Sequence, residues 1–235
     1  LLPRHAVLDE QDYVVFQALI TDPVTNRQRN QIYLKKSTDS GVSWSPAARV
    51  TDFGEFIGVA QRQPDAFNNE NASLHALEDR LVVTWERSID SPRPQIYYAE
   101  IAPDGEFLAN PEPVTNGVRT NRAPRAFSYG DRTYLLWFDN RAGADHVILG
   151  VKSGIVWMDF DLSEEVAGRS QFGLPFLLND ELFFLWENRN ERDSSIVYLR
   201  PDRTAPVPEI TPQNFESGQR HRQDTFSVTW NLPDD

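Results

Sequence analysis

The sequence has no cysteine and a single methionine among its 235 residues. Without thiols the chain can form no disulfide, use no cysteine nucleophile and bind no metal through sulfur. It also lacks any apolar run near the roughly 18 residues that a membrane-spanning helix requires, so we predict no transmembrane segment. Its four histidines are scattered without metal-ligand spacing. We find no phosphate-binding or dinucleotide-binding motif either, and we predict no metal and no cofactor.

Basic residues are too few to balance the acidic ones. The 23 Lys and Arg residues against 35 Asp and Glu residues give a formal net charge of −12. Such a chain repels polyphosphate and anionic lipid, which argues against nucleic acid and acidic membranes as partners. Protein and glycan ligands are the partners that this charge leaves open.

No segment shows sustained helical spacing of apolar residues, and proline and glycine leave little room for long helices. Short runs rich in Val, Ile, Tyr, Phe and Trp dominate instead, and Gly, Pro, Asn and Asp separate them. These runs predict strands at Tyr13–Ile20, Gln31–Lys35, Arg80–Trp85, Gln95–Ile101, Thr133–Phe138, His146–Val151, Glu181–Trp186 and Ser195–Leu199. The sequence therefore predicts an all-β protein.

The predicted strands repeat along the chain. A strand ending in tryptophan occurs at Trp85, Trp137 and Trp186, with spacings of 52 and 49 residues. A Pro-marked strand precedes each tryptophan, as in Arg62-Gln63-Pro64, and another strand follows it. A repeat of roughly 50 residues with three or four short strands is typical of a β-propeller blade. With a weaker first copy, we predict an antiparallel β-propeller of about four blades, alone or as part of a larger ring.

One segment carries a specific motif. Ser37-Thr38-Asp39-Ser40-Gly41-Val42-Ser43-Trp44 fits the pattern Ser/Thr-x-Asp-x-Gly-x-x-Trp without a gap. The motif resembles the Asp box of the bacterial neuraminidase (sialidase) repeat family, and the resemblance covers roughly residues 10 to 200. It implies a sialidase-type propeller whose Asp boxes lie at the blade peripheries, away from the central pocket.

We interpret this Asp box as structural. The motif begins at Ser37. The Asp39 carboxylate can accept hydrogen bonds from backbone N–H groups and thereby close the turn. Gly41 permits a positive φ inside the turn. Trp44 is expected to pack between strands or against the next blade, and Trp85, Trp137 and Trp186 are likewise expected to pack between blades.

An acidic residue and an arginine follow each repeated tryptophan. The acids are Glu86, Asp139 and Glu187, and the arginines are Arg87, Arg141 and Arg189. Salt bridges that hold a strand-end loop are the simplest interpretation, because catalysis rarely needs the same residue in every blade. The alternative makes one of the three acids a catalytic acid/base.

Three other arginines are candidate ligand-binding residues. The resemblance implies a cluster of arginines that holds a substrate carboxylate, and Arg122-Ala123-Pro124 is similar to the family's first Arg motif. Arg62, Arg122 and Arg125 are the three candidates. Arginine suits this role because its guanidinium can bind a carboxylate in a bidentate manner. Unlike in the family, Arg122 comes after the intact Asp box. The sequence also places Arg62 and Arg122 at the same repeat position, which a structural role explains equally well.

The composition changes after the blades. We assign residues 1–203 to propeller blades and 204–235 to a Pro-rich linker with a short β segment. That segment resembles the start of a fibronectin type III or immunoglobulin-like module, or else supplies an extra propeller strand containing Trp230. The chain begins without an initiator methionine, and we expect a processed or excised part of an exported, extracytoplasmic bacterial protein.

Two functions from different classes follow. The first is a non-catalytic binding or scaffold module, because the chain shows no recognisable Tyr–Glu–Asp set of sialidase chemistry. The second is a glycoside hydrolase acting on extracellular glycans, with the three arginines as anion clamps and one repeated acid as acid/base. Whether the three arginines meet beside a pair of carboxylates separates the two.

Overall fold

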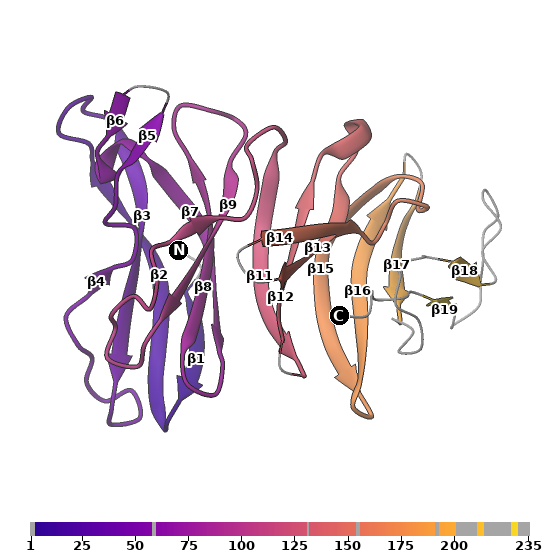
Figure 1. Cartoon of the computed structure of the whole chain (residues 1–235), viewed down its shortest axis with the longest axis horizontal. Coiled ribbons are helices and arrows are strands. Elements are labelled where there is room, and N and C mark those ends of the chain that lie inside the picture. The colour runs from indigo at the N-terminus through magenta and orange to yellow at the C-terminus, as the bar shows by residue number, and fades with distance from the viewer. Residues whose placement is uncertain are drawn as a thin grey trace. The chain divides into compact units, whose positions relative to one another are not determined.

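The structure is a computed structural model (Figure 1). It describes residues 3–57, 60–130, 132–153, 156–190 and 193–200, together with the backbone of two short strands at 211–213 and 227–229. Strands make up nearly all of its regular structure, and two short 3₁₀ turns occur at Pro64–Ala66 and Arg141–Gly143. The predicted all-β class is confirmed.

Four antiparallel sheets follow one another along the chain, which confirms the β-propeller prediction of about four blades. In the first two sheets the strands are β1 (Arg4–Leu8), β2 (Gln11–Thr21), β3 (Gln28–Ser37), β4 (Ala48–Arg49), β7 (Asn68–Ala76), β8 (Leu81–Ser88), β9 (Gln95–Ile101) and β10 (Glu112–Pro113). The third and fourth sheets hold β11 (Asn121–Tyr129), β12 (Arg132–Asp139), β13 (His146–Ser153), β14 (Val156–Asp161), β15 (Arg169–Leu178), β16 (Glu181–Arg189) and β17 (Ser194–Leu199). Two separate hairpins pair β5 (Glu55–Ile57) with β6 (Ala60–Arg62), and β18 (Thr211–Gln213) with β19 (Ser227–Thr229). Trp230 itself lies outside the described residues.

By compactness the chain divides into two units, residues 1–128 and 129–235. In the first unit the core joins the first two sheets, with Tyr13, Val15 and Ile32 packed against Trp85 and Tyr97. We call β7, β11 and β15, which start the second to fourth sheets in chain order, the leading strands.

The repeated tryptophans occupy equivalent buried positions, as predicted. Trp85, Trp137 and Trp186 lie on β8, β12 and β16, and all three are buried. Opposite Trp85 and opposite Trp186, the leading strand has two residues where one would normally pair with the tryptophan. The β7–β8 and β15–β16 strand pairs therefore each contain a β-bulge. The first bulge residues, Asn71 and Phe172, have φ values of 53° and 58°.

The Pro-marked segment before Trp85 differs from the prediction. Arg62 ends β6, and Pro64 starts a 3₁₀ turn, because proline fixes φ and removes a ladder donor. The leading strand of the second sheet is β7, which begins later at Asn68. Arg62 and Arg122 therefore do not share a repeat position.

Replacing a buried tryptophan tests the repeat packing. We expect Trp85→Ala to lower the free energy of unfolding by about 3–5 kcal/mol, because it leaves a large cavity in the core. Trp44→Ala should cost much less, since that side chain is 39% exposed. Denaturant unfolding of both variants measures the difference, and equal losses would contradict the packing described for Trp85.

Candidate functional site

The three repeated acids are not equivalent in the structure. Glu86 and Glu187 directly follow their tryptophans, whereas Asp139 comes two residues after Trp137. Side chains alternate between the faces of a strand, so this offset of one residue places Asp139 on the tryptophan's face and the two glutamates on the opposite face. Asp139 therefore meets a different environment from the two glutamates.

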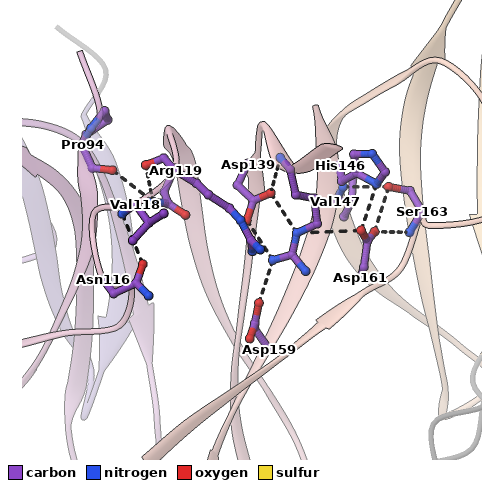
Figure 2. A network of polar contacts seen from close by, with 12 residues as sticks. Pro94, Asn116, Val118, Arg119, Asp139, His146, Val147, Asp159, Asp161 and Ser163 are labelled. Carbon is purple, nitrogen blue, oxygen red and sulfur yellow. Dashed lines mark hydrogen bonds and ion pairs between the residues drawn. The ribbon is translucent and has the colours of Figure 1, made fainter. Parts of the chain in front are cut away.

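Asp139 is held in an ion-pair network (Figure 2). Arg141 donates from Nε to Asp139 Oδ1 at 2.9 Å and from Nη2 to Asp139 Oδ2 at 2.8 Å. The same guanidinium bonds Asp159 at 2.6 Å, and Asp161 lies 2.9 Å from His146 Nδ1. Burial raises the pKa of Asp161. Burial alone would lower the pKa of Arg141, but the hydrogen bonds that Arg141 donates to Asp139 and Asp159 raise it. Asp139 is therefore paired with Arg141 in this network.

Glu187 also has a local arginine. Arg189 Nε donates to its Oε1 at 2.6 Å, and both residues lie on β16 two positions apart, on the same face. Exposed pairs of this kind contribute at most about 1 kcal/mol. The predicted acid–arginine pairing therefore describes Asp139 and Glu187.

Glu86 lacks this partner. Arg87 is the next residue, so its side chain points to the opposite face, where it is buried between the rings of Phe53 and Phe67. There it pairs with Glu55 at 2.7 Å, and burial lowers the pKa of Arg87 to about 10. Glu86 is thereby separated from the arginine that the motif pairs with it.

Two residues with positive φ, Asn71 at the β7 bulge and Ala123 on β11, hold Glu86. Its Oε1 accepts hydrogen bonds from Asn71 Nδ2 at 2.7 Å and from the backbone N–H of Ala123 at 2.8 Å. Both donors have a positive φ, 53° at Asn71 and 52° at Ala123. The Glu86 side chain is only 3% exposed, and burial raises its pKa, with the nearby Glu70 adding to the rise. A carboxyl in this environment keeps its proton to a higher pH than an exposed one.

More polar side chains surround Glu86. Glu70 lies directly opposite it across the β7–β8 ladder and accepts a hydrogen bond from Asn30 Nδ2 at 2.7 Å. Gln17 Oε1 accepts from the Asn71 N–H at 3.2 Å. The exposed Arg122 places Nη1 3.9 Å from Glu86 Oε2. We call these six residues the Glu86 cluster: Gln17, Asn30, Glu70, Asn71, Glu86 and Arg122.

The predicted arginine clamp is divided. Arg122 and Arg125 lie on β11, and Arg122 joins the Glu86 cluster. Burial and the charge of Arg4 lower the pKa of Arg125, which is half-buried. Arg62 is exposed and ends β6, which pairs with β5. Sequence reasoning missed Glu70, Asn71, Gln17 and Asn30, because no motif marks a bulge or the strand opposite Glu86.

The segment with the Asp-box motif forms a hydrogen-bonded turn after β3. Asp39 Oδ1 accepts from Ser37 Oγ at 2.7 Å and from the Ser43 N–H at 2.8 Å. Ser40 and Gly41 have positive φ values of 56° and 84°. The Trp44 Nε1 donates to Gly41 O at 3.1 Å, so the indole closes its own turn and stays partly exposed instead of packing between strands.

Among the residues that the structure describes, no group of three or more His, Asp or Glu side chains could hold a metal ion. Within the same residues, no helix is long and apolar enough to span a membrane.

Comparisons with known proteins give fold neighbours alone. No family model and no curated protein matches the chain. A thermostable family-43 glycoside hydrolase has a TM-score of 0.54 at 14% identity, over 96% of this chain and 73% of that one. Family 117 glycoside hydrolase Zg3597 of Zobellia galactanivorans gives 0.54 at 11% identity, over 83% and 65%. An α-L-arabinofuranosidase from Lactobacillus brevis gives 0.52 at 12% identity, over 81% and 66%.

These neighbours are β-propeller glycoside hydrolases, and at such identities the similarity shows the fold alone. This chain spans slightly less than two thirds of the length of the arabinofuranosidase and of Zg3597.

The Asp39 turn generates a pH prediction. Hydrogen bonds from Ser43 and Ser37 lower the pKa of Asp39 to about 2, below its ordinary value near 4. The carboxylate therefore stabilises the fold above about pH 4, and this contribution disappears as the pH falls towards 2. We expect Asp39→Ala to lower the melting temperature at pH 7 and to match the wild type near pH 2.

Asp79→Ala controls for the loss of an exposed negative charge, since Asp79 pairs with the adjacent Arg80 at 3.3 Å. A deficit of Asp39→Ala that persists unchanged at pH 2 would contradict the role of the carboxylate.

Proposed function

We propose that this chain is the propeller of a glycoside hydrolase that acts on an extracellular glycan, with the Glu86 cluster as its site. The single observation that carries the proposal is Glu86 itself, a buried carboxyl that differs from its repeat partners and faces a second carboxyl. The fold similarity to propeller glycoside hydrolases supports the same class of chemistry.

The chemistry of glycoside hydrolysis needs two carboxyl groups in different protonation states. A proton donor keeps its proton near neutral pH, and burial raises the pKa of Glu86 in that direction. Since Oε1 accepts both hydrogen bonds, the transferable proton belongs on Oε2, the oxygen nearer Arg122. Glu70, directly opposite, is the candidate base or nucleophile.

The remaining members of the cluster suit a sugar ligand. Amide side chains of Gln17, Asn30 and Asn71 present donors and acceptors for hydroxyl groups. Arg122 is exposed, and its guanidinium beside Glu86 presents N–H donors to sugar hydroxyl oxygens or to an acidic group of a glycan.

A glycan-binding scaffold is the second candidate. The observation that favours it is the 3% exposure of the Glu86 side chain, which limits its contact with a bound sugar. In this case Glu86 joins the leading strands β7 and β11 through its hydrogen bonds, and catalysis plays no part.

The sialidase-type assignment and the extracytoplasmic location are hypotheses. The former depends on the Asp39 turn. Sialidase chemistry also needs a tyrosine nucleophile. Tyr97 lies buried in the core, where burial and Glu55 raise its pKa. The Glu86 cluster contains no tyrosine, and we propose a glycan other than a sialoside.

Release of reducing sugar from arabinan, from other neutral polysaccharides and from a sialoside tests the function. We expect the wild type to cleave a non-sialoside substrate, and Glu86→Gln to reduce the rate by about 100-fold or more, because amide nitrogen cannot donate the proton as an acid does. Glu187→Gln is the matched control, since its carboxyl occupies the equivalent position and already pairs with Arg189.

Equal rates for Glu86→Gln and the wild type would contradict the assignment of Glu86. Binding of a glycan without cleavage, retained in Glu86→Gln, would favour the scaffold. A circular dichroism melt of each variant separates lost chemistry from lost folding.

A further inference from the structure

Two arginines of the first unit, Arg4 and Arg125, have no acidic partner among the residues that the structure describes. Arg4 begins β1 and is exposed, whereas Arg125 lies on β11 and is half-buried. Acidic partners are not scarce, since 35 Asp and Glu residues face 23 Lys and Arg residues in this chain. Three other buried or half-buried arginines of the same unit each contact a carboxylate at 2.8 Å or less: Arg29, Arg49 and Arg87.

Arg4 and Ser73 occupy one position in the first two sheets. Arg4 lies opposite Val15 on β2, and Ser73 lies opposite Thr84 on β8. Val15 and Thr84 are equivalent, because the residue that follows each of them lies opposite a tyrosine of the next strand. Residues that lie opposite each other share a face of the sheet, so the Arg4 and Ser73 side chains leave their blades on the same face.

Arg125 occupies this position in the third sheet. It follows Ala123, the β11 residue with a positive φ, by two residues, and Ser73 follows Asn71 on β7 by the same interval. The backbone N–H of the residue after Arg125 donates to Ser73 Oγ at 3.2 Å, which holds β11 beside β7 at this level. Strand β1 also packs against β7. Arg4 and Arg125 therefore lie at one level on the two strands that flank β7.

The two guanidinium groups are close enough to repel each other. Burial and the charge of Arg4 both lower the pKa of Arg125, and no carboxylate among the described residues raises it. Two like charges held together in a partly buried place cost free energy, which a bound anion between them offsets. In a chain with a net charge of −12, such a local excess of positive charge is the kind of place where an anion can bind.

We propose that Arg4 and Arg125, which we call the arginine pair, form a binding site for a carboxylate or sulfate group, carried by an acidic glycan or present as a free ion. Guanidinium N–H groups bind such oxyanions in bidentate geometry, and partial burial protects the contact from screening by salt. The sequence marks Arg125 as a candidate, but no motif marks Arg4.

The arginine pair lies outside the Glu86 cluster and close to it. Arg125 is two residues beyond Ala123, whose N–H donates to Glu86, and this interval is about 7 Å along a strand. An acidic sugar bound at the pair would therefore lie next to the Glu86 cluster. The site binds its anion whether or not that cluster is catalytic.

Isothermal titration calorimetry of the full chain at constant ionic strength tests the site with three probes: trigalacturonate, its uncharged methyl ester and sodium sulfate. We expect trigalacturonate to bind at least tenfold more tightly than the ester. Arg4→Gln and Arg125→Gln should each weaken its binding about tenfold, because each removes a charge-assisted hydrogen-bond donor. Arg62→Gln is the matched control, since it removes the same charge from an exposed position of the same unit.

A second variant separates lost recognition from lost folding. Arg125→Lys keeps the charge and should still weaken binding, because an ammonium group cannot bind an oxyanion in bidentate geometry. A circular dichroism melt of each variant checks that it folds as the wild type does.

The outcomes distinguish the two sources of the anion. Binding of sulfate that depends on both arginines, without binding of trigalacturonate, would support the site with a free ion as its ligand. Binding of none of the probes, equal affinity for trigalacturonate and its ester, or affinities unchanged in Arg4→Gln and Arg125→Gln would overturn the proposal. Calorimetry detects binding without cleavage, so these outcomes do not depend on whether the chain hydrolyses a glycan.

Discussion

The two-residue alternation of the β-strand is the constraint on which the rest of this structure depends. It gives each blade one face for a tryptophan and another face for the residue that follows it. On β8 the alternation sends Arg87 between two phenylalanine rings and leaves Glu86 facing β11. Of these adjacent residues, Arg87 therefore contributes to packing, whereas Glu86 is the candidate for chemistry.

The fold was largely predictable because apolar alternation and tryptophan spacing follow directly from packing. The Glu86 cluster was not. Its members come from five strands, and the bulge at Asn71 and the positive φ of Ala123, which aim two donors at one carboxylate oxygen, leave no sequence motif. The repeated acid–arginine pattern also concealed the offset between Glu86 and Asp139, since both lie near a tryptophan and an arginine. The Pro-marked pattern misplaced Arg62 for a similar reason, because a 3₁₀ turn and a strand can both contain proline.

Burial of the Glu86 carboxyl costs free energy that is not offset by a close arginine, as it is for Asp139 and Glu187. Asp139 and Glu187 gain an arginine on their own face, whereas Glu86 is buried with hydrogen bonds and an arginine beyond hydrogen-bond distance. Burial without a close counter-charge favours the neutral acid. A structure that keeps such a group beside a second carboxyl, instead of an apolar residue, gives a physical reason to assign it a function.

The protonation state of Glu86 is the central claim, and NMR titration of protein labelled at the glutamate carboxyl carbons measures it directly. The account predicts one glutamate that titrates clearly above the ordinary value near 4.3 and that is absent from the Glu86→Gln spectrum. If every glutamate titrated in the ordinary range, or if the outlier persisted in Glu86→Gln, the account would be contradicted.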